Sequence, residues 1–157
     1  MDSKLILIAD SDVVFAVELG IRLEKSGHRV VIVPDATRAM GYLYSAPFPP
    51  DLLITDLSMP EQDAIVFFRV VGESFPFLPV VVCAEYITAE FFREVYCAET
   101  RAFLRKPVNY AVLSTTITRM LDTVEARSRS IVPDNRDKTG AFEFATETNL
   151  CGLFGTC

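Results

Sequence analysis

The sequence predicts an α/β protein with a doubly wound, five-stranded parallel sheet that is covered by helices on both faces. Short apolar runs alternate along the chain with longer segments whose apolar residues recur at helical spacing. Two of these runs lead into an aspartate. Alternating strands and helices form parallel β–α units, and right-handed crossovers distribute the helices over both faces of the sheet.

The expected strands are short and mostly apolar, and they occupy residues 5–9, 30–33, 52–54, 80–82 and 101–105. The first run, LILIA, is continuously apolar, which is typical of a strand that is covered on both faces. It leads into Asp10, and the third run leads into Asp56. In a flavodoxin-like strand order, 2-1-3-4-5, functional sites form at the carboxyl ends of the strands, so we expect both aspartates at one edge of the sheet.

One helix is expected after each strand. The first is amphipathic, with its apolar residues at i, i+3, i+4 and i+7 and an end near Gly27. These apolar residues are Ala16, Leu19, Gly20 and Leu23. Asp35 is expected to cap the second helix. The third and fourth helices are expected at residues 64–71 and 89–97, and the last has apolar residues at helical spacing between positions 113 and 124.

Length and composition favour one globular domain and exclude several kinds of partner. The chain has 157 residues, and 50% of them are hydrophobic, which is enough to bury a sizeable core. The net charge is −6, and the sequence contains no cluster of Lys and Arg that could replace the counterions of nucleic-acid phosphates. We therefore expect neither nucleic acid nor an anionic membrane surface as a partner.

Cysteine spacing and the N-terminal residues favour a cytoplasmic protein. The four cysteines, at positions 83, 97, 151 and 157, match no zinc-binding spacing, and the single histidine, His28, is expected at the surface in a turn. Reduced thiols are the simplest interpretation. No basic region precedes the first apolar run, so no signal peptide is expected, and no stretch approaches the ~20 apolar residues of a membrane span.

The composition changes near residue 128, so we expect residues 1–127 to form the domain and residues 128–157 to form a linker and a tail. Residues 128–140 are polar, whereas residues 141–157 contain several Phe and Leu side chains. The tail is either disordered or docked on its own domain or on a partner. It is short and lacks a helix-turn-helix pattern, so we do not expect a DNA-binding output domain.

Acidic residues and one lysine are expected to meet at the carboxyl edge of the sheet. Asp10 follows the first strand, Asp56 the third and Lys106 the fifth, while Cys83 ends the fourth. Carboxylates held close together repel one another unless a cation lies between them, and Mg²⁺ prefers such oxygen ligands. A carboxylate beside Mg²⁺ can attack a phosphoryl group, and a lysine offsets the charge on that group. The pattern therefore indicates phosphoryl transfer to Asp56.

Three segments resemble the receiver domains of bacterial response regulators in two-component systems. Residues 53–60, LITDLSMP, resemble the phosphoacceptor segment, and residues 103–107, FLRKP, resemble the fifth strand with its Lys-Pro. Residues 6–10, ILIAD, resemble the first strand and the start of its acidic pair. The resemblance spans roughly residues 4–124. It implies a flavodoxin-like phosphorylatable switch that signals through protein contacts, and not an enzyme beyond its own phosphorylation and dephosphorylation.

The resemblance assigns a role to each residue of the pocket. Asp56 is the expected phosphoacceptor, and Asp10, Asp56 and the backbone carbonyl of Met59 are the expected Mg²⁺ ligands. Lys106 is expected to pair with Asp56 or its phosphate, and Phe103 occupies an aromatic position that often moves on activation. The implied partners are a sensor histidine kinase or a phosphotransfer protein, and an unidentified downstream protein. A homodimer is left open.

The pocket departs from the family's pattern at three positions. Ser11 stands where a second acid is usual, although Asp12 follows it; either could contribute to the metal site, and Asp12 could equally cap a helix. Cys83 stands where Ser or Thr is usual and is a weaker donor to phosphate, although it also fits plain core packing. Ala64 replaces a usual Gly. We therefore expect weak Mg²⁺ binding, and the main alternative is a pseudo-receiver that is not regulated by phosphorylation.

A phosphatase of the haloacid-dehalogenase type is a remote alternative. Residues 10–14, DSDVV, resemble its nucleophile motif, in which Asp10 would be the nucleophile. That family needs a later acidic metal motif, and nothing suitable follows Lys106. This alternative also leaves Asp56 unexplained.

Overall fold

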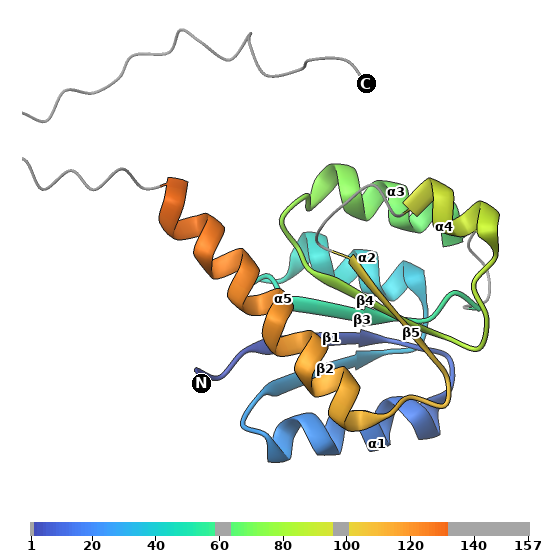
Figure 1. Cartoon of the computed structure of the whole chain (residues 1–157), viewed down its shortest axis with the longest axis horizontal. Helices are drawn as coiled ribbons and strands as arrows, with labels where there is room; N and C mark the ends of the chain where they lie inside the picture. The colour runs from blue at the N-terminus through green and yellow to red at the C-terminus, as the bar shows by residue number, and fades with distance from the viewer. Residues whose placement is uncertain (1, 59–63, 96–100, 132–157) are drawn as a thin grey trace, which may run out of the picture.

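The fold is a five-stranded parallel sheet between two layers of helices (Figure 1). The computed structural model describes residues 2–58, 64–95 and 101–131. Strands and helices alternate along the chain in the order β1 (Leu5–Ala9), α1 (Val13–Lys25), β2 (Arg29–Val33), α2 (Ala36–Ser45), β3 (Leu52–Thr55), α3 (Ala64–Ser74), β4 (Val80–Ala84), α4 (Ala89–Val95), β5 (Arg101–Arg105) and α5 (Tyr110–Ile131).

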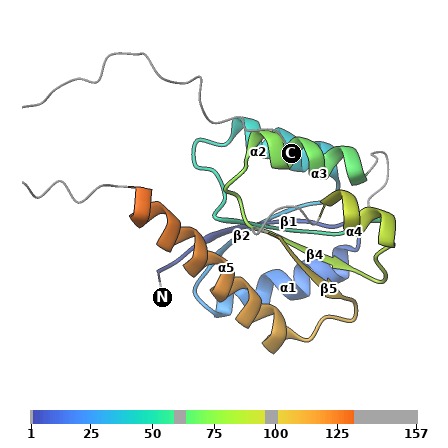
Figure 2. The ribbon, with the colours of Figure 1, turned by 45° about the horizontal axis from the view of Figure 1, so that its top comes forward.

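The strand order is β2-β1-β3-β4-β5, and all neighbouring strands are parallel. Helices α1 and α5 cover one face of the sheet, and α2, α3 and α4 cover the other (Figure 2). The predicted fold class and strand order are therefore confirmed. The register aligns Ala9 of β1 with Thr55 of β3, and Ala84 of β4 with Arg105 of β5, so the carboxyl ends of these strands meet at one edge.

The central strands are buried on both faces, and their alternate residues contribute to two separate apolar clusters. In β1, Leu7 and Ala9 pack with residues of α2 and α3, whereas Ile6 and Ile8 pack with residues of α1 and α5. Every residue of β1 and of β4 is buried. The two clusters thereby hold the ends of the strands, and the side chains that follow them, in fixed positions.

Helix α1 has the buried face that the periodicity predicts. Its buried residues are Ala16, Leu19, Gly20 and Leu23. Asp12 caps the helix, because its side chain accepts a hydrogen bond from the Phe15 amide at 3.0 Å. The helix ends at Lys25, and Gly27 then takes a φ of 92°, a left-handed conformation that glycine adopts without steric cost.

Helix α3 is longer than expected, whereas the turn before β2 lies where the pattern predicts it. Helix α3 continues to Ser74, although the pattern predicts an end at Gly72, because a glycine inside a helix is tolerated when the segment around it packs well. His28 lies in the predicted turn before β2, and part of its side chain is exposed at the surface. Its side chain is half-buried, since the turn at Gly27 folds the chain back so that the His28 amide donates to the Leu23 carbonyl at 3.1 Å. Burial lowers the pKa of this imidazole, and its Nδ1 has no hydrogen-bond partner among the described residues.

Helix α5 continues to Ile131, past the boundary expected at residue 127. The Ser128 and Ser130 hydroxyls donate to backbone carbonyls one turn earlier, so these polar side chains are accommodated on the exposed surface of the helix. Residues 132–157, which contain the rest of the expected linker and tail, lie outside the described residues. Within the part of the chain that is described, no helix combines the length and the apolar character needed to cross a membrane.

Candidate functional site

Three charged side chains meet at the carboxyl edge of the sheet. Asp10 directly follows β1, Asp56 follows β3, and Lys106 follows β5. The Lys106 Nζ atom lies 2.8 Å from Asp10 Oδ2 and 3.6 Å from Asp56 Oδ2. The parallel register of the strands brings these residues together although they are distant in the sequence. The structure therefore brings together the three charged residues that the sequence pattern predicts for phosphoryl transfer.

Asp10 is 2% exposed, and both of its carboxylate oxygens accept hydrogen bonds. Oδ1 accepts one from the Asp12 amide at 2.8 Å, and Oδ2 accepts one from the Lys106 ammonium. Burial raises the pKa of the Asp10 carboxyl and the charge of Asp56 adds to this rise, while the two hydrogen bonds oppose it. The ionised form of Asp10 is therefore maintained at a cost in free energy, which a bound cation would offset.

Asp56 is buried beside it, with 7% of its surface exposed. Its amide donates to the Ala9 carbonyl at 3.2 Å, which ties the end of β3 to β1. Its Oδ1 accepts a hydrogen bond from the Leu57 amide at 2.6 Å, whereas Oδ2 lies beyond ordinary hydrogen-bond distance from Lys106. Among the described residues, Oδ2 is thus the oxygen with the weaker partner and the better placed of the two to act as a nucleophile.

Lys106 is fixed by a backbone hydrogen bond to β4 and by the contacts of its ammonium with two carboxylates. Its amide donates to the Ala84 carbonyl at 2.8 Å, and its side chain is 14% exposed. Burial disfavours the ammonium, but the hydrogen bond to Asp10 and the charges of Asp10 and Asp56 outweigh it, so the pKa of Lys106 is raised. The expected partner is Asp56 or its phosphate, yet the closer carboxylate in this structure is that of Asp10.

The ring of Phe15 also contacts the lysine, with Lys106 Nζ 4.3 Å from the ring centroid. Phe15 is not among the residues that the sequence pattern predicts for the site, because a phenylalanine near the start of an amphipathic helix is ordinarily a packing residue. The available signal is its place in the chain. It lies three residues after the cap Asp12, in the turn of α1 nearest to the strand ends.

Cys83 lies in β4 and is fully buried as a free thiol. It belongs to the apolar cluster beneath α1 and α5, together with Ile8 and Leu113. Burial raises the pKa of the thiol to about 12; the positive charge of Lys106 opposes this rise, and nearby carboxylates add to it. Cys83 is therefore a core residue, and it is also close enough to the pocket for its pKa to respond to the charges there.

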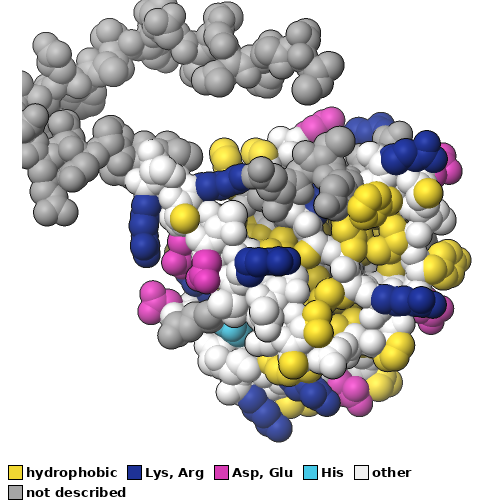
Figure 3. Space-filling model, viewed as in Figure 1, with side chains coloured by type: hydrophobic (Ala, Val, Ile, Leu, Met, Phe, Trp, Pro, Cys, Tyr) yellow, Lys and Arg dark blue, Asp and Glu magenta, His cyan; other side chains and the backbone are white. Residues whose placement is uncertain are grey.

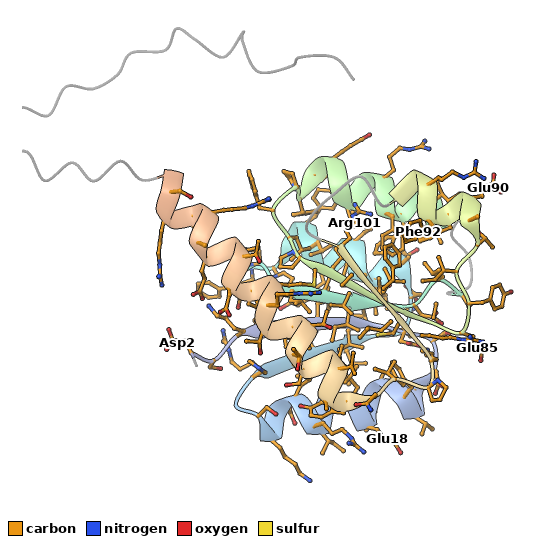
Figure 4. All side chains as sticks on the ribbon, viewed as in Figure 1. Asp2, Glu18, Glu85, Glu90, Phe92 and Arg101 are labelled. Carbon is orange, nitrogen blue, oxygen red and sulfur yellow. The ribbon has the colours of Figure 1, made fainter. Side chains whose placement is uncertain are left out.

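The structure describes three of the four remaining residues that the sequence predicts for the site. Ser11 and Asp12 are exposed, and Asp12 is engaged as the cap of α1. Met59, whose carbonyl is an expected metal ligand, lies outside the described residues. Phe103 contacts Phe92 of α4, which Figure 4 labels, with the ring centroids 5.6 Å apart. The aromatic position in β5 is thus packed against α4.

The pocket offers two carboxylates to a hard cation such as Mg²⁺, but no third acidic side chain from the described residues. Asp10 and Asp56 offer buried carboxylate oxygens, which are the ligands that Mg²⁺ prefers. Within residues 2–58, 64–95 and 101–131, no group of three or more Asp, Glu, His or Cys side chains is placed to hold a metal ion. The described residues would therefore supply two carboxylates to a magnesium site, with Lys106 already offsetting part of their charge.

The fold and the pocket define a doubly wound α/β protein with buried acids and a lysine at the carboxyl edge of its sheet. The family model of the response regulator receiver domain matches residues 6–118. The chain belongs to this family. The phosphatase alternative, in which Asp10 would be the nucleophile, consequently has no support.

Similar proteins include bacterial regulators that are longer than this chain. The sensory/regulatory protein RpfC of Xanthomonas campestris is 34% identical over 119 residues, which cover 73% of this chain and 16% of RpfC. The DNA-binding transcriptional regulator NtrC of Rhizobium meliloti is 28% identical over 87% of this chain and 28% of its own length. The virulence transcriptional regulatory protein PhoP of Salmonella typhi is 27% identical, with 92% and 71% covered.

Solved structures support the fold. A CheY-like response regulator receiver domain from Methanospirillum hungatei superposes with a TM-score of 0.73 at 23% identity, covering 80% of this chain and 99% of that one. The receiver domain of a LuxO repressor protein from Vibrio parahaemolyticus gives a TM-score of 0.72 at 16% identity, with 83% and 99% covered. At these identities the likeness establishes the fold alone.

Proposed function

We propose that this chain is a phosphorylatable receiver whose phosphoacceptor is Asp56. The observation that carries the proposal is the buried Asp56 carboxylate, whose Oδ2 lies 3.6 Å from Lys106 Nζ at the edge where the strands end. Asp56 Oδ2 would attack the phosphorus of a phosphodonor, so that a new O–P bond forms while the bond to the leaving group breaks. The leaving group departs with the electron pair, and Lys106 offsets the negative charge on the transferring oxygens.

We propose Asp10 and Asp56 as the carboxylate ligands of Mg²⁺, with the Met59 carbonyl as a further ligand from outside the described residues. The ion would neutralise charge on the transferring phosphoryl group. Because Asp10 Oδ2 already accepts a hydrogen bond from Lys106, a cation must compete with the ammonium for this oxygen. We expect Mg²⁺ binding to be weak for this reason, and also because Ser11 stands where the family usually has a second acid beside Asp10.

We infer that the phosphodonor is a sensor histidine kinase or a phosphotransfer protein, and that the output is a protein contact. Helix α1 begins beside the pocket and exposes an apolar strip that consists of Val13, Val14, Val17 and Ile21. On the face shown in Figure 3, Lys and Arg side chains are spread out and are not gathered in one stripe. These surfaces favour a protein partner over nucleic acid. Catalysis would be confined to the chain's own phosphorylation and dephosphorylation.

A pseudo-receiver, which binds its partners without being phosphorylated, is the second candidate. Cys83 favours it, because a thiol with its pKa raised to about 12 is a weak hydrogen-bond donor to phosphate. Ser11 favours it too, since an exposed hydroxyl brings no charge to a metal site.

Intact-mass measurement after incubation with acetyl phosphate and Mg²⁺ tests the proposal. The wild-type chain should gain one phosphate, while Asp56→Asn, which keeps the shape of the side chain but not the nucleophile, should gain none. An absence of labelling in the wild-type chain would support the pseudo-receiver. Retention of labelling in Asp56→Asn would show that another residue accepts the phosphate.

A further inference from the structure

The Lys106 ammonium contacts an aromatic ring as well as two carboxylates. Its Nζ lies 4.3 Å from the centroid of the Phe15 ring, well inside the ~6 Å over which a cation–π attraction is effective. Two other cation–π pairs of the described chain, Arg101 on Phe68 and Arg22 on Tyr110, are longer, at 5.4 and 5.5 Å. The contact also lies in a partly desolvated pocket, where such an attraction is stronger than at an exposed site.

The start of α1 determines where this ring lies. Asp12 accepts a hydrogen bond from the Phe15 amide, which fixes the first turn of the helix directly after β1. The Phe15 side chain is half-buried and packs at the margin of the apolar cluster beneath α1 and α5. Its ring is therefore anchored by packing on one side and presents a face to the ammonium on the other.

The surroundings of Lys106 offer its flexible side chain other positions. A groove of about 660 Å³ runs between α1 and the β5–α5 connection, and both Phe15 and Lys106 line it. Glu18 and Glu85, which Figure 4 labels, line the same groove. Arg22 and Arg105 line it too, so an ammonium that swung outward into the groove would enter surroundings with charges of both signs and would leave Asp56. The Phe15 ring favours the inward position, because the cation–π contact is made where the ammonium is also within 3.6 Å of Asp56 Oδ2.

We propose that Phe15 is a positioning residue for phosphoryl transfer, whose ring holds the Lys106 ammonium beside Asp56. The inference rests on the proposed function of Asp56 as phosphoacceptor. A broad π face lets the ammonium move from Asp10 toward the phosphoryl oxygens without losing its contact with the ring. Charge that is already in place when the transition state forms accelerates the transfer.

Three variants separate positioning from plain packing. Phe15→Leu keeps an apolar side chain but removes the ring, Phe15→Tyr keeps the ring, and Tyr110→Leu is the matched control. Tyr110 lines the same groove and packs on the same cluster, but its cation partner is Arg22. Thermal unfolding of each variant reports any loss of packing separately.

The rate of phosphorylation by acetyl phosphate, measured by intact mass, is the first readout. Phe15→Leu should be about threefold to tenfold slower than wild type, the range that a partly desolvated cation–π contact supports. Phe15→Tyr should be phosphorylated at close to the wild-type rate because it keeps the ring, and Tyr110→Leu should also keep the wild-type rate. In a Lys106→Met background, Phe15→Leu should cause no further slowing, because the ring then has no ammonium to hold.

The NMR shift of the Lys106 ε-methylene protons is the second readout, and it requires no phosphate. In the wild-type chain the ring current should move these signals upfield, and Phe15→Leu should abolish that displacement. A normal rate in Phe15→Leu, or equal slowing with and without Lys106, would overturn the positioning role while wild-type labelling still upheld the function of Asp56. Unlabelled wild-type protein would instead refute the proposed function, and the NMR shift would still decide whether Phe15 places the ammonium.

Discussion

Lys106 donates a hydrogen bond to Asp10 at 2.8 Å, so in this structure the lysine is paired with the acid that follows β1. Asp56 lies farther away, with 3.6 Å between its Oδ2 and the same nitrogen. Two buried carboxylates therefore share one ammonium, and the pocket keeps an excess of negative charge. Phosphorylation adds charge on the Asp56 side, which would draw Lys106 away from Asp10. Before phosphorylation, Lys106 is therefore paired with Asp10, and it would move toward Asp56 when a phosphoryl group is bound there.

Asp10→Asn should stabilise the metal-free protein at neutral pH by about 1 kcal/mol, because it removes one of the crowded carboxylates while Asp56 still neutralises Lys106. The folded-state pKa of Asp10 is raised above the unfolded value of about 3.9, mainly by burial, so the folded state binds this proton more tightly. The resulting stability is fully present below about pH 3.9 and is lost as the pH rises through the folded pKa. The advantage of the variant should therefore disappear in acid.

Urea unfolding at neutral and acidic pH, with EDTA present, measures this difference. Added Mg²⁺ should stabilise the wild-type chain and have less effect on Asp10→Asn, because a ligand stabilises only a fold that binds it. Destabilisation of the variant at neutral pH would mean that the Lys106–Asp10 hydrogen bond outweighs the repulsion between the carboxylates.

The Cys83 thiol should resist alkylation in the folded protein at pH 8. Its pKa is raised to about 12 by burial, so almost none of it is the reactive thiolate, and the side chain is fully buried. Peptide mapping after treatment with iodoacetamide should find Cys83 unmodified in native protein and modified in urea. Complete native labelling would show that the pocket opens to solvent far more than the structure indicates.

Gly72 of α3 makes room for the guanidinium of Arg101, which Figure 4 labels between α3 and β5. Arg101 Nη2 donates to the Phe68 carbonyl at 2.9 Å, and a Cβ at position 72 would lie 2.6 Å from that nitrogen. Gly72→Ala should therefore destabilise the protein by about 1 kcal/mol, since the lost charged hydrogen bond exceeds the gain in helix propensity.

In an Arg101→Met background, the effect of Gly72→Ala on the free energy of unfolding should have the opposite sign. Without the guanidinium, Gly72→Ala should stabilise the protein by about 1 kcal/mol through helix propensity. Denaturant unfolding of the four proteins in this double-mutant cycle gives the coupling between positions 72 and 101. A coupling of zero would mean that Arg101 moves aside without loss.

The sheet, the helices and the position of the acidic edge follow from patterns that the sequence displays directly. Strand and helix periods determine which residues are buried, as in β1 and in the inner face of α1, and parallel β–α units determine that Asp10, Asp56 and Lys106 meet. These features depend on many residues at once, so no single side chain can overturn them.

The pairing of Lys106 and the contacts of Phe15 and Gly72 depend on the conformations of single side chains, so the sequence does not predict them. The difference between Lys106 pairing with Asp10 and pairing with Asp56 is less than 1 Å in distance. Phe15 and Gly72 matter through contacts with residues far along the chain, which leave no local pattern. The sequence alone allows Asp12 to be either a metal ligand or a helix cap, and the hydrogen bond from the Phe15 amide shows that it caps α1.

Replacement of Asp12 should separate capping from metal binding. Asp12→Asn keeps an oxygen that can accept the Phe15 hydrogen bond, so stability should be nearly unchanged, whereas Asp12→Ala should lose about 1 kcal/mol. Because the side chain is engaged at the helix end, both variants should bind Mg²⁺ as the wild type does. A marked loss of Mg²⁺ affinity in Asp12→Asn, seen by calorimetric titration, would instead make Asp12 a metal ligand.

Ser11→Asp should bind Mg²⁺ about tenfold more tightly than wild type and should be phosphorylated faster when Mg²⁺ is limiting. Ser11 is exposed and directly follows Asp10, so a carboxylate there would reach the same edge of the sheet. A carboxylate about 4 Å from a unit charge gains on the order of 4 kcal/mol at an effective dielectric constant near 20. Repulsion between the new carboxylate and those of Asp10 and Asp56 offsets part of this attraction. The net gain in binding free energy is roughly 1–2 kcal/mol, or about tenfold in affinity.

Ser11→Asn is the matched control for this change, since it supplies an oxygen without a charge and should alter the affinity little. Calorimetric titration of EDTA-treated protein compares the three chains, and labelling by acetyl phosphate at low Mg²⁺ follows the consequence for transfer. An affinity in Ser11→Asp equal to that of the wild type would show that the missing acid is not what weakens the site. The competition between Mg²⁺ and the Lys106 ammonium for Asp10 Oδ2 would then be the remaining physical cause.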